Sequence, residues 1–195
     1  MAVGGSDGTI RLTPWRGSES TRVIEQHSDW VLAVAFSPNG EWVASASRDR
    51  SARVFRVANG EMISAFLEHG KPVQALVFDA SGEKVFSGGK DNALHVWSVK
   101  EGKKLGSAAG FGGEIHALAR VEGRVYSGSA DGKVRSHSAE NSPGTTVVLD
   151  CGSPVLALAH DARGRRLACG TQNGEVWVIE LGKQGSPVRL HAGRN

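Results

Sequence analysis

Residues 87–99, SGGKDNALHVWSV, decide how the whole chain is interpreted. The stretch contains a short apolar strand, a tight turn at Lys90-Asp91-Asn92, and a second strand that ends in Val96-Trp97. Related stretches occur on both sides of it, each with a carboxylate or amide residue in the turn. These anchor residues follow one another at intervals of 42, 42, 40 and 42 residues, at Asp7, Asp49, Asp91, Asp131 and Asn173. Five anchors at nearly one period indicate an internal repeat.

A second landmark follows the same period. A histidine lies 20 residues after each of the first two anchors, at His27 and His69, and the same offset falls on Phe111 and Cys151. An alternating apolar segment begins four residues later in each repeat. A period of about 40 to 45 residues with a loop histidine, four short strands and a Trp-Asp-like end is typical of one propeller blade. The chain therefore resembles the WD-repeat β-propeller family over nearly its whole length.

The composition agrees with an all-β chain. Glycine accounts for 26 of the 195 residues, mostly at turns, and no window shows a sustained helical apolar period. We predict an all-β fold, a β-propeller of four-stranded antiparallel blades with about five repeats. We expect a single domain, 1–195, whose repeats run roughly over 1–26, 27–68, 69–110, 111–150 and 151–195.

One blade is expected to be incomplete. Repeat two shows the full pattern, with strands expected at 31–36, 42–47, 52–57 and 62–66. The first repeat begins inside its second strand, so we predict that its innermost strand is missing. An open blade face exposes apolar surface, so the ring has to close. Three routes could close the ring: a tight five-bladed ring, a second copy of the chain, or further sequence of a longer protein. We favour the last two.

The resemblance implies a hydrogen-bond relay in each blade. In this family the strands are named a to d outward from the channel, and the relay joins a histidine of the d–a loop, a strand-b Ser or Thr, a strand-c Trp and the turn Asp. By register we assign it to His27, Ser47, Asp49, His69, Asp91, Trp97, Ser129, Asp131 and Thr171. Because Phe55 and Gly89 interrupt blades two and three, we expect no complete relay. Half-satisfied buried networks destabilise, so we expect modest stability, lowest toward the C-terminus.

The same side-chain types form hydrolase triads, but here they recur once per blade instead of converging on one site. We therefore predict no enzyme and no catalytic residues. The remaining histidines show no metal-site spacing, so we predict no metal and no cofactor. Cys151 and Cys169 also lack metal-ligand spacing. We expect two free thiols there. A disulfide is an alternative only if the strands that carry the two cysteines converge.

The resemblance also implies a binding face. Propellers of this family bind peptides or proteins on the face made by the d–a and b–c loops, near the channel. Register places six candidate residues there: Trp30, Arg48, Lys71, Lys90, Glu114 and Gln172. One aromatic side chain beside three cations favours an acidic or phosphorylated peptide. An ordinary solvated rim is the alternative.

We therefore predict a non-catalytic protein-interaction scaffold. The alternatives are the propeller portion of a larger enzyme or signalling protein, and a propeller that closes its ring as a homodimer or higher oligomer. The net charge of +3 comes from 23 basic and 20 acidic side chains, well mixed. We assign the turn cations to solubility rather than nucleic-acid binding: Lys100, Lys103, Lys104, Arg163, Arg165 and Arg166.

No apolar run approaches the roughly 18 residues that a membrane span needs. The segment after Met1 shows neither the charged start nor the apolar core of a signal peptide. We therefore predict no membrane partner and a cytoplasmic location.

Overall fold

The computed structural model describes residues 1–15, 20–161, 163, 165–182 and 187–190. These residues form one three-stranded and four four-stranded antiparallel sheets, and no helix occurs within them. The prediction of an all-β propeller of about five repeats, with a first blade that lacks its inner strand, is confirmed. The final stretch of the predicted fifth repeat, 191–195, lies outside the described residues. The described residues hold no helix of the length and hydropathy that a bilayer crossing requires.

Each sheet is one blade, and its strands follow one another in sequence order. Blade one contains β1 (Ala2–Gly4), β2 (Thr9–Leu12) and β3 (Arg22–Glu25). Blade two contains β4 (Val31–Phe36), β5 (Trp42–Ser47), β6 (Ala52–Arg56) and β7 (Met62–Phe66). Blade three contains β8 (Val73–Phe78), β9 (Lys84–Gly89), β10 (Leu94–Ser98) and β11 (Lys104–Ala108). Blade four contains β12 (Ile115–Val121), β13 (Arg124–Ser129), β14 (Lys133–Ser138) and β15 (Thr145–Asp150). Blade five contains β16 (Val155–His160), β17 (Arg166–Thr171), β18 (Val176–Glu180) and β19 (Val188–Leu190).

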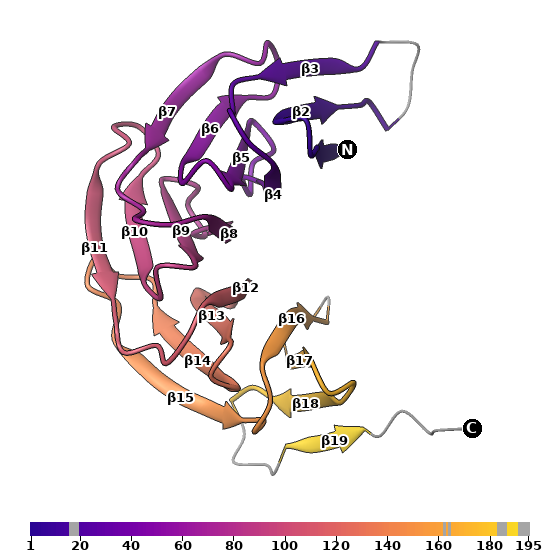
Figure 1. Ribbon diagram of the computed structural model, residues 1–195, viewed down its shortest axis with the longest axis vertical. Helices are drawn as coiled ribbons and strands as arrows, with labels where there is room; N and C mark the ends of the chain where they lie inside the picture. The colour runs from indigo at the N-terminus through magenta and orange to yellow at the C-terminus, as the bar shows by residue number, and fades with distance from the viewer. Residues whose placement is uncertain (16–19, 162, 164, 183–186, 191–195) are drawn as a thin grey trace.

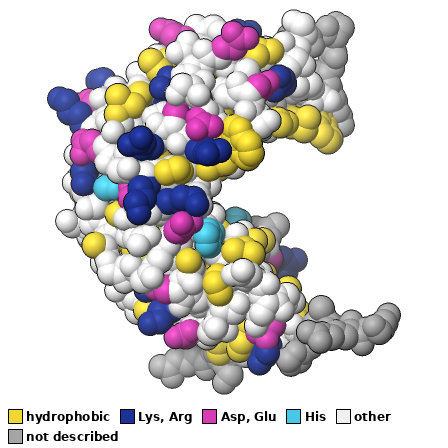
Figure 2. All heavy atoms as spheres, viewed as in Figure 1, with side chains coloured by type: hydrophobic (Ala, Val, Ile, Leu, Met, Phe, Trp, Pro, Cys, Tyr) yellow, Lys and Arg dark blue, Asp and Glu magenta, His cyan; other side chains and the backbone are white. Residues whose placement is uncertain are grey.

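The blades fan out side by side in an open arc, with blade one at one end and blade five at the other (Figure 1). The strands β4, β8, β12 and β16 are neighbours at the inner side of this arc. In the space-filling view the molecule is hollowed between the two ends, and acidic and basic side chains are interleaved over the visible face (Figure 2).

The core lies between blades, because alternate residues of each strand face the neighbouring sheet. Between blades two and three, Phe66 stacks on Trp97 with ring centres 5.5 Å apart. A separate apolar cluster fills each of the other three contacts between blades. At Gly128 the neighbouring blade approaches so closely that a Cβ atom would lie 2.5 Å from Val155. Packing of blade against blade is therefore what holds the arc together.

A one-residue bulge recurs at the same place in blades two to five. The first residue of strand a pairs with strand b, the second has no partner, and the third resumes the ladder. The bulged residues are Leu32, Gln74, His116 and Leu156. Two of them meet across a blade boundary, where His116 Nδ1 lies 3.0 Å from Gln74 Oε1.

Candidate functional site

Blade three contains a complete relay. The indole N–H of Trp97 donates to Ser87 Oγ at 3.0 Å, and Ser87 Oγ lies 2.8 Å from His69 Nε2. The other ring nitrogen, His69 Nδ1, lies 2.7 Å from Asp91 Oδ2. The prediction that no blade has a complete relay is therefore wrong. The error came from placing the hydroxyl position at Gly89, whereas the hydroxyl is supplied two residues earlier.

Blade two shows the same displacement by two residues. His27 Nε2 lies 2.7 Å from Ser45 Oγ, and His27 Nδ1 lies 2.8 Å from Asp49 Oδ2. The predicted hydroxyl, Ser47, is not the histidine's partner: it donates to the Asp29 carbonyl and accepts the N–H of Asp49. Residues two apart in a strand share a face, so sequence register alone did not separate these two serines.

Ser129 and Thr171 occupy the position of Ser47 and also belong to the turn. Ser129 Oγ donates to Asp131 at 2.5 Å, and Thr171 Oγ1 donates to Asn173 Oδ1 at 2.6 Å. The relay hydroxyl of blade four is Ser127, which lies 2.8 Å from His137 Nε2. The assignments of Ser47, Ser129 and Thr171 to the relay are therefore corrected: these side chains cap the b–c turns.

Blade four replaces the loop histidine by an arginine brought from its own strand c. The Arg135 guanidinium lies over the ring of Phe111, 4.8 Å from its centre, and reaches Asp131 Oδ2 at 2.6 Å. Both partners of this ion pair are largely buried. The carboxylate thus keeps a charged neighbour although the histidine position is apolar.

A basic residue four positions after the anchor aspartate recurs in the first four blades, and the prediction missed it. This spacing places the side chain on strand c beside the turn. The pairs are Arg11–Asp7 at 2.5 Å, Arg53–Asp49 at 3.8 Å, His95–Asp91 at 3.6 Å and Arg135–Asp131 at 2.6 Å. The recurrence is visible in the sequence once the repeats are aligned on their anchors.

Burial and hydrogen bonding together set the protonation states of the relay. Burial lowers the pKa of His27 and of His69 more than the neighbouring carboxylates raise it. Burial also raises the pKa of Asp49, but hydrogen bonds from Ser51 and His27 outweigh it and lower that pKa to about 2. At neutral pH a neutral imidazole therefore donates through Nδ1 to a charged carboxylate, and its Nε2 accepts from serine.

The order Ser87, His69, Asp91 matches that of a hydrolase triad. However, the Ser87 side chain is fully buried, and its oxygen already accepts the indole N–H. A nucleophile has to reach its substrate, and an enclosed hydroxyl does not.

The cluster of His69, Asp91 and His95 brings three possible metal-ligand atoms within 4.8 Å of one another. Asp91 Oδ1 and His95 Nδ1 are buried without a partner among the described residues. Both nitrogens of His69 are, however, engaged in the relay. Metal binding there would break the relay, so the donor set suits hydrogen bonding better than coordination.

The d–a and b–c loops form one surface, which we call the loop face: residues 27–30, 69–72, 111–114 and 151–154 together with 48–51, 90–93, 130–132 and 172–175. The same backbone hydrogen bond joins the two loops in blades two to five. Its donors are the N–H groups of residues 48, 90, 130 and 172, and its acceptors are the carbonyls of residues 30, 72, 114 and 154, at 2.8 to 3.0 Å. The loops therefore hold their side chains on a fixed frame.

Two groups of candidate residues come together on the loop face. The Trp30 side chain is half exposed, and the Arg48 guanidinium lies 5.5 Å from its ring centre. Arg48 also pairs with Asp29 at 3.6 Å, while Lys90 pairs with Glu114 at 3.4 Å.

Lys71 and Gln172 belong to neither group. Lys71 is exposed on the d–a loop of blade three, and none of the ion pairs within the described ranges includes it. Gln172 is exposed on the b–c loop of blade five. The prediction did not include the ion pairs that Arg48 and Lys90, two of the three candidate cations, make with acidic neighbours.

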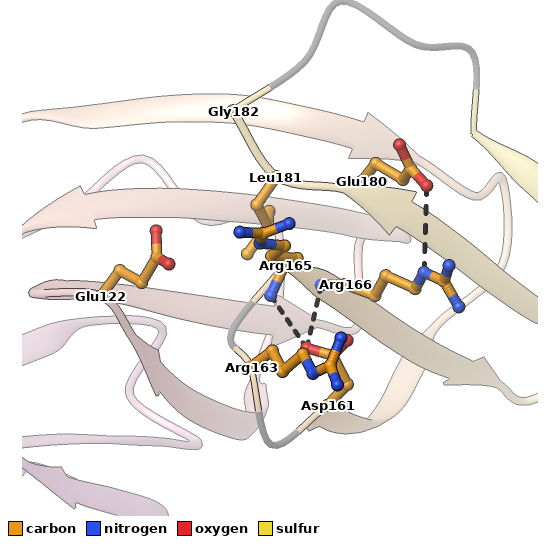
Figure 3. A pocket seen from close by; sticks show the side chains of 8 residues that line it. All are labelled: Glu122, Asp161, Arg163, Arg165, Arg166, Glu180, Leu181 and Gly182. Carbon is orange, nitrogen blue, oxygen red and sulfur yellow. Dashed lines mark hydrogen bonds and ion pairs between the residues drawn. The ribbon is translucent and has the colours of Figure 1, made fainter.

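A hollow lies away from the loop face, between blades four and five. It has a volume of about 700 Å³, and Figure 3 shows its arginines beside acidic side chains. Asp161 Oδ1 accepts the backbone N–H groups of Arg165 and Arg166, and Arg166 Nε lies 3.8 Å from Glu180. The charged lining residues are three arginines and three acids: Arg163, Arg165, Arg166, Glu122, Asp161 and Glu180. The hollow therefore offers no concentrated positive charge for a polyanion.

Comparison with known proteins agrees with the repeat structure. The family described as "WD domain, G-beta repeat" matches residues 18–56 and 60–98. "Protein pleiotropic regulatory locus 1" of Arabidopsis thaliana is 43% identical over 47 residues, 24% of this chain and 9% of that protein. "Protein transport protein SEC13" of Pyricularia oryzae is 36% identical over 64 residues, 28% of this chain and 22% of that protein. "Pre-mRNA-splicing factor prp46" of Aspergillus fumigatus is 39% identical over 49 residues, 25% of this chain and 10% of that protein.

In each of these three alignments the chain spans less than a quarter of the relative's length. The two matched segments contain the strands β3 to β6 and β7 to β10, so they include every strand of blades two and three except β11. The same anchors, loops and bulges continue into blades four and five. The chain therefore carries WD repeats over the matched residues 18–56 and 60–98, within a five-bladed arrangement of antiparallel sheets.

Proposed function

We propose that the chain is a non-catalytic protein-interaction scaffold that binds a peptide or protein on the loop face. The observation that carries the proposal is the exposed Trp30 ring, held beside Arg48 by the backbone bond that recurs in four blades. An aromatic side chain on a rigid frame buries a large area at little cost in conformational entropy. The names of two relatives, a transport protein and a splicing factor, are compatible with such a role.

The charges of the loop face favour a partner with few acidic groups rather than a strongly acidic one. Asp29 and Glu114 offset Arg48 and Lys90, which leaves Arg50 and Lys71 as the exposed loop-face cations with no ion pair in the described ranges. A carboxylate or phosphate near Lys71 together with an apolar side chain on Trp30 would satisfy both features. On the face that Figure 2 shows, acidic side chains lie among the basic ones, which favours a protein partner over nucleic acid.

The experiment is a selection of peptides from a random displayed library by the immobilised chain, followed by affinity measurement on the enriched peptides. Trp30→Ala and Lys71→Glu are expected to weaken binding about tenfold or more, since aromatic anchors dominate such interfaces. The matched control is Lys103→Glu, an exposed lysine on a c–d turn. Full affinity in both loop-face variants, or an equal loss of affinity in the Lys103→Glu control, would contradict the assignment of peptide binding to the loop face.

A second candidate, ring closure through another copy, rests on the exposed apolar residues of the two end blades. Val3 and Val23 in blade one are each 47% exposed, and blade five exposes a set of four: Leu156, Val176, Val188 and Leu190. Covering such surface stabilises an assembly at about 25 cal/mol per Å². Light scattering separates the cases: a concentration-independent monomer of 20.6 kDa excludes the homo-oligomer.

A further inference from the structure

Blade five places two cysteines where the other blades place their relay. Cys151 occupies the d–a loop position of His27 and His69, and Cys169 occupies the strand-b position of Ser45 and Ser87. In blades two and three these positions lie within hydrogen-bond distance of each other. In blade five the two sulfur atoms lie 3.7 Å apart.

The backbone of each cysteine is held in place. The N–H of Cys151 donates to the carbonyl of Gly132 at 2.8 Å, in the neighbouring blade. Cys169 lies in the middle of strand β17, paired with Leu158 on one side and Trp177 on the other. A disulfide has an S–S length of about 2.0 Å, so rotation of the two side chains has to shorten the observed separation by less than 2 Å. The backbone frame already brings the pair to this distance.

The surroundings of the pair are apolar. Cys151 and Cys169 are 7% and 1% exposed and belong to the cluster that joins blades four and five, with Val155, Leu167 and Ile179. Burial raises the pKa of the Cys151 thiol to about 12, and it raises the pKa of Cys169 as well. Thiolate is therefore scarce at neutral pH, which makes exchange slow while the blade stays closed.

We propose that Cys151 and Cys169 form a dithiol–disulfide site that cross-links the d–a loop of blade five to strand β17. The oxidised pair would replace, by a covalent bond, the link that His69 and Ser87 make in blade three. This site is independent of any partner on the loop face.

The chemistry balances with a small disulfide as oxidant. The thiolate of one cysteine attacks a sulfur of oxidised glutathione, and one glutathione thiolate leaves. The second cysteine thiolate then attacks the cysteine sulfur of the mixed disulfide, and the second glutathione thiolate leaves. Two cysteine thiols are oxidised, one disulfide is reduced, and the protons pass to the two glutathione thiolates.

The test is the equilibrium constant for this exchange, measured with the folded chain and with the chain unfolded in guanidinium. Both are incubated in a series of reduced and oxidised glutathione ratios at mildly alkaline pH, approached from the reduced and the oxidised side. Acid quench, alkylation and peptide mass mapping then count the cross-linked species. The folded chain is expected to favour the cross-link by at least tenfold, because the fold has already brought the sulfurs together. An equal or smaller constant in the folded chain would overturn the proposal.

Hydrogen exchange gives a second readout on the native protein. Amides of β16, β17 and β18 are expected to exchange on the order of tenfold more slowly in the oxidised chain, because the cross-link removes opened states. The Cys151→Ser chain in the same buffers is the control and should show no such change. Unchanged exchange in the oxidised native chain would show that the bond does not brace the blade.

Discussion

The indole N–H of Trp97 donates to the hydroxyl oxygen of Ser87 at 3.0 Å, inside a part of blade three where both side chains are fully buried. The same oxygen lies 2.8 Å from His69 Nε2. One hydroxyl therefore serves a strand and a loop at the same time. A buried donor that loses its partner costs about 1–3 kcal/mol, so this atom has a large effect on stability for its size.

Ser87→Ala is expected to lower the free energy of unfolding by about 2–3 kcal/mol, because it leaves the Trp97 N–H and a ring nitrogen of His69 unpaired. Ser45→Ala is the matched control, since Phe55 offers no N–H in blade two and only His27 loses a partner. Its expected loss is about 1 kcal/mol. Urea unfolding of both variants measures the difference, and equal losses would contradict the two-partner role of Ser87.

Gly89→Ser tests the corrected position of the relay hydroxyl. A Cβ atom at Gly89 would lie 2.1 Å from the carbonyl oxygen of Pro72 and 2.9 Å from Val73 Cα, both backbone atoms. We expect a loss of about 1–3 kcal/mol from overpacking. Gly70→Ser, where nothing lies within 4 Å of the added Cβ, is the control. If thermal denaturation showed Gly89→Ser to be stabilising, the clash argument would fail.

His137 is expected to make stability depend on pH. Burial, followed by the charges of Arg135 and Arg124, lowers its pKa to about 4. An unfolded histidine titrates near about 6.5, so between these values the unfolded chain holds a proton that the folded chain does not. Stability is therefore complete above about pH 6.5 and falls, by up to about 3 kcal/mol, as the pH drops toward 4.

The His137→Gln chain is expected to lose this part of the pH dependence. The His160→Gln chain, in which an exposed histidine is replaced, is the control for the loss of one imidazole. Denaturant unfolding from pH 7.5 to 4.5 measures the slope. A slope in His137→Gln equal to that of the parent chain would contradict the assignment.

Arg135→Ala is expected to destabilise blade four by about 3 kcal/mol, because it leaves the largely buried Asp131 carboxylate without its charged partner. Arg11→Ala breaks an exposed ion pair of the same spacing, with Asp7, and should change the unfolding free energy far less, because solvent screens the pair. The ratio of the two effects is the informative quantity. Equal losses would mean that burial of Asp131 does not determine the strength of the pair.

The blade pattern was predictable from the sequence because its signals are local. A turn aspartate, a hairpin and an alternating strand lie within one repeat, so the spacing located the repeats, and the family resemblance then identified the missing inner strand of blade one. The relay hydroxyl was misplaced because Ser45 and Ser47 share a strand face and differ only in depth along it. How far along the strand the histidine ring reaches depends on how the blade packs, and the spacing of residues in the sequence does not show this.

Contacts between loops and blades were harder to predict. The sequence placed Trp30 and Arg48 on one face. It did not show that Glu114 of blade four neutralises Lys90 of blade three, because this ion pair joins two different blades. The meeting of Cys151 and Cys169 was left conditional, although both residues fall on relay positions once the repeats are aligned. Aligning every blade on its histidine and its strand-b serine would have revealed this pair.

In blades two to five, the recurring bulge leaves one residue of strand a outside the ladder, while the other residues of the strand hold the sheet together. Leu32, Gln74, His116 and Leu156 have no ladder partner, so their identity is not constrained by the strand opposite them. The four positions carry two leucines, an amide and an imidazole on the same backbone geometry. Blades two to five thus each contain one position on the inner side of the arc whose residue type can change without loss of a ladder pair, so a designer could set the chemistry of that side one blade at a time.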